Sequence, residues 1–176
     1  MNLTIEKATL NDIDEVALLY DDICDHLATK EYNPGFRKGC YPTRSEALYF
    51  YNADALYVAK IDGKTVGSIA LTHNANAEVN EELKYIEEEQ KDILYVHEFI
   101  VHPDYLRQGI GSKILSFADE IAKQEGVKCL RLYVYEKNSV AIKAYERNGY
   151  VFMEKVDIGL SELGLDWFCL YEKILA

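Results

Sequence analysis

The order of apolar segments in residues 93–174 constrains the fold more than any other feature of the chain. Ile93–Val101 is a strongly apolar run that Pro103 ends, and an amphipathic helical pattern then begins at Gly109 and ends at Gly126. The pattern continues as strand, helix, strand and strand over Val127–Val134, Asn138–Gly149, Tyr150–Val156 and Trp167–Ile174. This alternation predicts an α/β (α+β) fold, a mixed sheet with helices on both faces.

The first half supplies further elements of the same domain. The residue pattern predicts a strand over Leu3–Lys7 and then a helix that Asn11 caps and that runs to about Thr29. A second helix is expected over Arg44–Asn52, with Thr43 as its cap. A β-hairpin follows, with strands Leu56–Ile61 and Thr65–Thr72 joined by the turn Asp62-Gly63. A chain of 176 residues fits one domain, so we expect residues 1–176 to form a single unit.

Residues 75–92 differ from the rest because acidic side chains dominate them over a narrow apolar stripe. We interpret them as a charged helical insertion. An acidic helix can attract a cationic acceptor, but a solvated surface helix is the simpler interpretation and the one we favour.

Charge and cysteine content exclude several classes of function. The net charge of -11 and a pI near 4.8 disfavour nucleic acid and anionic membranes as partners, although a small anionic cofactor responds mainly to its local site. The four cysteines form no CxxC pair, so no metal site is expected, and free thiols indicate a reducing cytoplasm. The sequence shows no signal peptide, and no apolar run reaches the ~20 residues that span a bilayer.

A glycine-containing turn follows the strand at Phe99–Val101 and opens the next helix. The unpaired amides and partial positive charge of a helix N-terminus bind phosphate, and Gly109 and Gly111 allow a pyrophosphate to approach the backbone. Arg107 and Lys113 can add positive charge. A Rossmann fingerprint is disfavoured because Ile114 stands where it needs a third glycine, and no Walker loop is present. A purely structural glycine turn is the alternative.

A second motif, Asn138-x-x-Ala141-x-x-x-Tyr145-x-x-x-Gly149-Tyr150, follows one strand later. Together with Val101-His-Pro103 and Gly109-x-Gly111 it resembles the GNAT acetyltransferase superfamily over residues 93–156. The resemblance implies a GNAT-like central mixed, mostly antiparallel sheet, and acetyl-CoA (coenzyme A) as cofactor. In one departure, the Gln or Arg that the family has three residues before the first glycine is Leu106 here.

The same resemblance implies which residues bind the cofactor. The strand pairs its backbone with the pantetheine arm, the turn holds the pyrophosphate, and the second motif completes the site. The cofactor-binding residues expected are Phe99, Ile100, Val101, Arg107, Gln108, Gly109, Ile110, Gly111, Ser112, Lys113, Asn138 and Tyr145.

Tyr145 is the catalytic acid that this resemblance favours, because the departing thiolate needs a proton and a phenol is a plausible donor. The alternative is a tyrosine that only packs in the core. A bulge in the strand near His97 to Phe99 would free an N–H for the thioester oxygen, an effect worth about 3 kcal/mol in acyl-transfer sites.

The acceptor amine must lose a proton, and Glu98 and His97 are the candidate bases, with Tyr95 beside them or a water as intermediary. Glu98 points away from His97 unless a bulge reorients it. Certain polyamine acetyltransferases of the superfamily carry acidic residues at both positions, and only Glu98 is acidic here. By family analogy, the aromatic residues Tyr32, Phe36 and Tyr41, together with Tyr95, line the acceptor pocket.

The sequence thus predicts an N-acetyltransferase that moves an acetyl group from acetyl-CoA to a primary amine by direct attack in a ternary complex. The alternative is a catalytically weak acyl-CoA-binding or interaction module on the same fold. The sequence does not identify the acceptor, which could be a polyamine, an antibiotic amine, an amino acid or a protein N-terminus. It also leaves open whether the protein forms a homodimer.

Overall fold

A computed structural model describes residues 2–75 and 90–175 of the chain. Residues 76–89, most of the expected charged insertion, lie outside the described residues. The strands form one sheet, with bounds β1 Leu3–Lys7, β2 Leu56–Ile61, β3 Lys64–Thr72, β4 Ile93–Val101, β5 Cys129–Tyr135, β6 Val151–Val156 and β7 Phe168–Ile174. The helices are α1 Ile13–Leu27, α2 Arg44–Asn52, α3 Ile110–Glu125 and α4 Ser139–Arg147. Short 3-10 turns lie at η1 Leu10–Asp12, η3 Gln90–Asp92, η4 Pro103–Tyr105 and η5 Ser161–Leu163.

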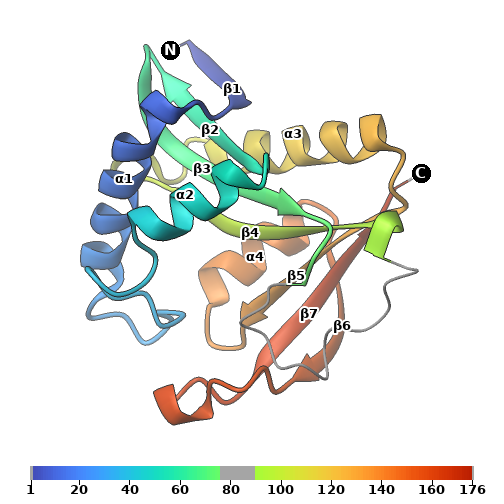
Figure 1. Cartoon of the computed structure of the whole chain (residues 1–176). Helices are drawn as coiled ribbons and strands as arrows, with labels where there is room; N and C mark the ends of the chain where they lie inside the picture. Colours follow the sequence, from blue (N-terminus) through green and yellow to red (C-terminus); the bar gives the residue numbers. More distant parts are fainter. Residues whose placement is uncertain (1, 76–89, 176) are drawn as a thin grey trace.

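The sheet runs in the order β1-β2-β3-β4-β5-β7-β6 (Figure 1). Neighbouring strands are antiparallel except for β4 and β5, which pair in parallel. This arrangement confirms the mixed, mostly antiparallel sheet that was expected. A parallel pair needs a crossover connection, and α3 supplies it.

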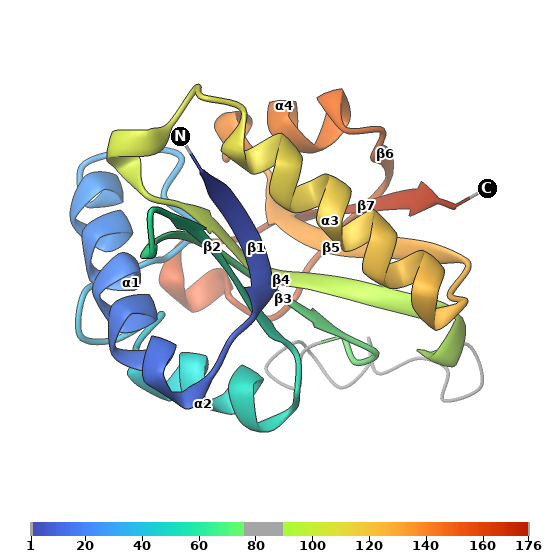
Figure 2. The same ribbon diagram turned by 90° about the horizontal axis from the view of Figure 1, so that it is seen from above.

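Helices cover both faces of the sheet, as Figures 1 and 2 show. Alternate residues of β2 explain the two layers, because successive strand side chains point to opposite faces. Leu56 and Val58 pack in a core with α1 and α2, whereas Tyr57 and Ala59 pack in a second core with α3 and Tyr145 of α4.

The start of α1 differs from the sequence prediction. Asp12, not Asn11, is the N-cap of α1. The Asp12 carboxylate also completes a capping box with Thr9 at the start of η1, where it accepts hydrogen bonds from the Thr9 amide at 2.7 Å and hydroxyl at 3.0 Å. The predicted cap of α2 is confirmed, since the Thr43 hydroxyl accepts from the Ser45 amide at 3.2 Å. Among the described helices, none combines the length and apolar character that crossing a membrane requires.

Candidate active site

The site begins where the two parallel strands separate. β4 and β5 pair over Ile93–Tyr95 and Cys129–Arg131, and the ladder then stops although both strands continue. The backbone of β4 from residue 96 to 101 therefore has no partner from β5 within the described chain, and a cavity of about 1100 Å³ opens there. An exposed strand edge can pair with another extended chain, such as a pantetheine arm.

A bulge interrupts β4 beside this opening. Ser68 of β3 pairs with Ile100 and Ala70 pairs with His97, so two residues of β4, Glu98 and Phe99, stand opposite one residue of β3. Glu98 takes the left-handed conformation, with φ 46°, which is uncommon for a residue other than glycine. The bulge expected near His97 to Phe99 is thus present.

The bulge places Glu98 in the cavity lining. The Tyr41 hydroxyl donates to Glu98 Oε1 over 2.5 Å, although 57 residues separate the two in sequence. The Ser68 hydroxyl donates to the Glu98 carbonyl oxygen at 3.4 Å, which ties the bulge to β3.

His97 also lines the cavity, but its side-chain contacts differ from those of Glu98. Its ring stacks on Phe50 of α2 at 5.5 Å, and its Nε2 lies 2.9 Å from the Thr72 hydroxyl and 3.2 Å from the Asn74 carbonyl oxygen. Because the Thr72 hydroxyl itself donates to that carbonyl, both neighbours accept from His97, and the ring proton lies on Nε2. Burial lowers the pKa of His97 to about 4.

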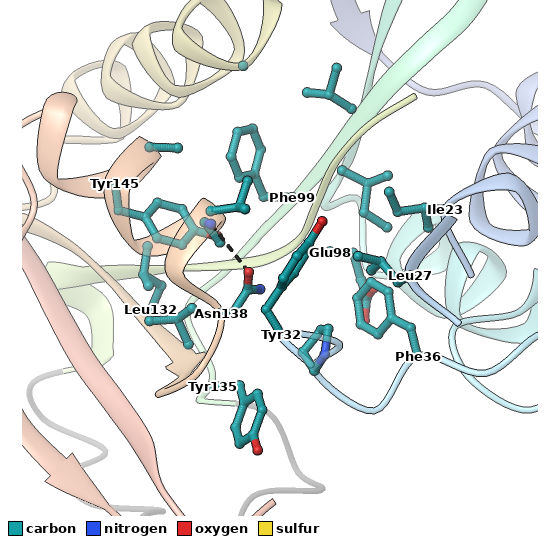
Figure 3. Close-up of a pocket in the computed structure, with 18 of the residues that line it drawn as sticks. Ile23, Leu27, Tyr32, Phe36, Glu98, Phe99, Leu132, Tyr135, Asn138 and Tyr145 are labelled. Atoms are coloured by element: carbon teal, nitrogen blue, oxygen red, sulfur yellow. Dashed lines mark hydrogen bonds between the residues drawn. The ribbon is translucent and has the colours of Figure 1, made fainter. Parts of the chain in front are cut away.

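Tyr145 of α4 is 8% exposed and lines the same cavity as Glu98. Its ring lies 5.7 Å from that of Phe99 (Figure 3). Burial, and then the charge of Glu98, raise the pKa of Tyr145 well above its ordinary value, so the phenol stays protonated at neutral pH. Asn138 fixes the start of α4 by accepting from the Ala141 amide at 3.3 Å.

The turn before α3 has the backbone that a phosphate site needs. Arg107 and Gly109 are left-handed, with φ 61° and 78°, and Gly109 is the N-cap of α3. At Gly111, a Cβ atom would lie 3.3 Å from Phe99 Cζ, so a side chain would crowd the wall of the cavity. The first amides of α3 are therefore accessible to a bound anion.

Most of the expected cofactor-binding residues line the cavity: Phe99, Ile100, Val101, Arg107, Gly109, Ile110, Gly111, Ser112, Asn138 and Tyr145. Two lie elsewhere. The Gln108 side chain donates to the Asp104 carbonyl oxygen at 3.2 Å, and Lys113 lines a separate hollow beside Leu3.

The sequence analysis did not assign two basic residues of α4 to the site. Lys143 and Arg147 line the cavity with Arg107 and Lys30, and Glu98 is the sole carboxylate residue among the described residues that line it. The i, i+4 spacing of Lys143 and Arg147 across the turn that holds Tyr145 is a signal that could have found them. This positive wall suits an anionic cofactor despite the negative net charge.

Tyr32, Phe36 and Tyr41, the residues expected in an acceptor pocket, line the cavity. Tyr95 also lines it, with its ring stacked on Tyr133 at 6.4 Å. Figure 3 shows Tyr32 between Tyr145 and Phe99 on one side and Ile23, Leu27 and Phe36 on the other. The β6–β7 loop, which sequence reasoning left without a role, contributes apolar residues to the lining: Ile158, Leu160, Leu163 and Leu165.

The chemistry of this lining favours acyl transfer. No group of three or more metal-binding side chains occurs in the part of the chain that the structure describes. Instead, an open strand edge, a helix N-terminus and basic side chains meet the carboxylate of Glu98 and the phenol of Tyr145. Those two groups can move protons beside an acyl group held along β4.

The sequence profile of the acetyltransferase (GNAT) family matches residues 22–150. The chain belongs to this family. An uncharacterized N-acetyltransferase of Methanocaldococcus jannaschii is 29% identical over 159 residues, 87% of this chain, and the match spans only 62% of that relative's length. A spermidine N(1)-acetyltransferase of Thermoplasma acidophilum is 40% identical over 48 residues, 27% of this chain and 30% of the relative.

The PaiA N-acetyltransferase of Thermoplasma acidophilum, solved in complex with coenzyme A, has the same fold. The two chains match with a TM-score of 0.70 over 99% of each, at 22% identity. Family membership confirms the enzyme class and cofactor predicted from the sequence, an acetyl-CoA-dependent N-acetyltransferase of the GNAT family.

Proposed function

We propose that this protein transfers the acetyl group of acetyl-CoA to a primary amine by direct attack within a ternary complex. The observation that carries the proposal is the bulge in β4, which places Glu98 in the cavity that Tyr145 lines from α4. A base and an acid are thereby available in one cavity, beside the unpaired edge of a strand.

The residues present fit the cofactor. The open edge of β4 pairs with the pantetheine arm, the amides at the start of α3 bind the pyrophosphate, and Arg107, Lys143 and Arg147 complement its negative charge. When bound, acetyl-CoA supplies an activated thioester. A backbone amide that the bulge between His97 and Phe99 leaves unpaired would stabilise the acyl oxygen by hydrogen bonding.

Two proton transfers remain for the side chains. The acceptor arrives as an ammonium ion, and Glu98 takes its proton directly or through a water. Tyr145 then protonates the departing thiolate, and its raised pKa means that the phenol still holds its proton at neutral pH. As the bond from nitrogen to the acyl carbon forms and the bond from carbon to sulfur breaks, the nitrogen loses two protons in becoming the amide. Glu98 takes the first and later passes it to solvent, and the second replaces the proton that Tyr145 gives to sulfur, so the phenol is restored.

Glu98 is favoured over His97 as the base. Burial disfavours the charged imidazolium that His97 would form on taking a proton and lowers the pKa of His97 to about 4, whereas a carboxylate that takes a proton becomes neutral. The Nε2 of His97 is also bonded to Thr72 and Asn74, which fixes the ring against α2.

A catalytically weak acyl-CoA-binding module is the second candidate function. Such a module needs the strand edge and the glycine turn, but neither Glu98 in the cavity nor Tyr145 beside Phe99. The presence of both groups favours the enzyme.

The test is acetyl-CoA-dependent thiol release with an amine panel, followed by pH profiles of Glu98→Gln and a His97→Gln control. We expect Glu98→Gln to lower kcat/KM by about 10²–10⁴-fold at neutral pH, because general base catalysis contributes that range. The loss becomes smaller at alkaline pH, where more of the amine is already neutral. The His97→Gln profile stays parallel to that of the unmutated enzyme.

A Glu98→Gln profile parallel to the unmutated one contradicts the assignment of the base. Coenzyme A binding without thiol release, across the whole panel, favours the binding module instead.

A further inference from the structure

The half of the cavity away from the helix α3 turn is where the acceptor binds if the proposed function holds. We call it the acceptor chamber. Its walls are the end of α1 with Ile23 and Leu27, the loop of residues 28–43 with Phe36, and the β6–β7 loop of residues 157–167 with Leu160 and Leu165. These walls are largely apolar, and the same cavity contains Glu98.

The two loops touch each other across the chamber. A Cβ atom built on Gly35 would lie 2.7 Å from Leu165 Cδ1, so Leu165 packs directly against the glycine backbone. Leu165 is 6% exposed and clusters with Ile158 and Phe168. A polypeptide that passed between the loops would have to break this contact. The chamber therefore fits a small molecule better than a protein chain.

The charges of the chamber fit one ammonium group. Among the described residues that line the cavity, Glu98 alone carries a carboxylate. The Tyr41 hydroxyl already donates to one of its two oxygens. His26, near the end of α1, and the cationic Lys30 of the following loop also line the cavity. A second ammonium group on the acceptor would lose its hydration against apolar walls, and the described residues of the lining offer it no carboxylate other than Glu98.

We propose that the acceptor is a small monoamine whose amine carbon carries an aromatic or branched aliphatic group. Its ammonium group binds at Glu98, and the apolar group packs between Phe36 of the first loop and Leu160 of the second. This inference rests on the proposed function and narrows it to a substrate class. It separates this chain from enzymes that acetylate polyamines.

The test compares kcat/KM for phenethylamine, ethylamine, spermidine and a short peptide with a free N-terminus. We expect phenethylamine to exceed ethylamine by roughly 10- to 100-fold, because burying the added apolar group in the chamber stabilises the transition state. Spermidine and the peptide should fall below phenethylamine. A higher kcat/KM for spermidine or for the peptide overturns the inference while leaving amine acetylation intact.

Two matched variants test which residues cause the preference for phenethylamine over ethylamine. Phe36→Ala should reduce the phenethylamine-to-ethylamine ratio about tenfold and leave the KM for acetyl-CoA unchanged, since Phe36 lies on the acceptor side. Phe152→Ala, at a residue of β6 that is 48% exposed and outside the cavity lining, should leave the ratio unchanged. A ratio unchanged in Phe36→Ala places the apolar group elsewhere and overturns the inference. Absence of transfer to every amine, despite coenzyme A binding, refutes the proposed function instead.

Discussion

Two neighbouring tyrosines show how position decides the role of a buried phenol. Tyr145 and Tyr150 lie with their rings 5.6 Å apart, and burial raises the pKa of both. Tyr145 lines the cavity, whereas the Tyr150 hydroxyl is buried without a partner among the described residues. The same chemical group therefore has access to an acyl group at one position and none at the other.

Tyr145→Phe should lower turnover by about 10²–10⁴-fold, because it removes the proton donor and leaves the ring. The KM for acetyl-CoA should change much less, since one neutral hydrogen bond contributes on the order of 1 kcal/mol. Steady-state kinetics with an accepted amine measure both quantities. Tyr150→Phe is the matched control and should retain turnover, with unchanged or slightly higher stability. Turnover within about twofold of normal in Tyr145→Phe would make the residue structural and leave water as the acid.

At the scale of the element, α3 has a left-handed glycine at each end. Gly109 at its start has φ 78° and lies in the cavity lining, and Gly126 at its end has φ 71° and lies outside it. A β-branched residue is strained in this conformation by about 1–3 kcal/mol. The two positions therefore carry a similar backbone cost but differ in their distance from the cofactor.

Gly109→Val should lower acetyl-CoA affinity by at least about tenfold, because the strained turn no longer presents its amides to the pyrophosphate. Gly126→Val should lower the melting temperature about as much as Gly109→Val does, because the backbone strain is similar, but it should leave the acetyl-CoA affinity unchanged. Calorimetric titration and thermal unfolding of both variants measure these effects. Equal affinities in the two variants would refute the placement of the pyrophosphate at this turn.

At the scale of the whole molecule, two electrostatic effects oppose each other. The net charge of -11 repels an anionic cofactor, whereas Arg107, Lys143 and Arg147 in the cavity lining attract it. The local charges are closer to the cofactor than the distributed ones, and Coulomb energy falls with distance. We therefore expect attraction to dominate at the site.

The KM for acetyl-CoA should accordingly rise as salt increases, because the Debye length shrinks from about 30 Å at 0.01 M to about 8 Å at 0.15 M. In a variant carrying both Lys143→Gln and Arg147→Gln, the KM at low salt should be higher and its salt dependence weaker. Kinetics at four salt concentrations provide the measurement. A KM that falls with salt in the unmutated enzyme would show that the net charge dominates.

The sequence by itself determined the elements and the cofactor turn. Strands and helices follow from periodicities of two and 3.6 residues, and the Gly109 turn and the Asn138 cap depend on neighbours within a few positions. These features are local, so they can be read without knowing the register of the sheet. The misassigned cap at Asn11 is a local error, because Asp12 competes for the same role.

Only the tertiary structure determined which side chains meet on the proposed acceptor side of the cavity. The hydrogen bond between Tyr41 and Glu98 requires the register shift in β4, and the contact between Gly35 and Leu165 joins two distant loops. Adding one residue to a strand changes the direction of the side chains that follow, and alternation alone does not locate that residue. Sequence patterns therefore identified the acetyl-transfer family, while the register and loop packing shaped the part of the cavity where we propose that the amine binds.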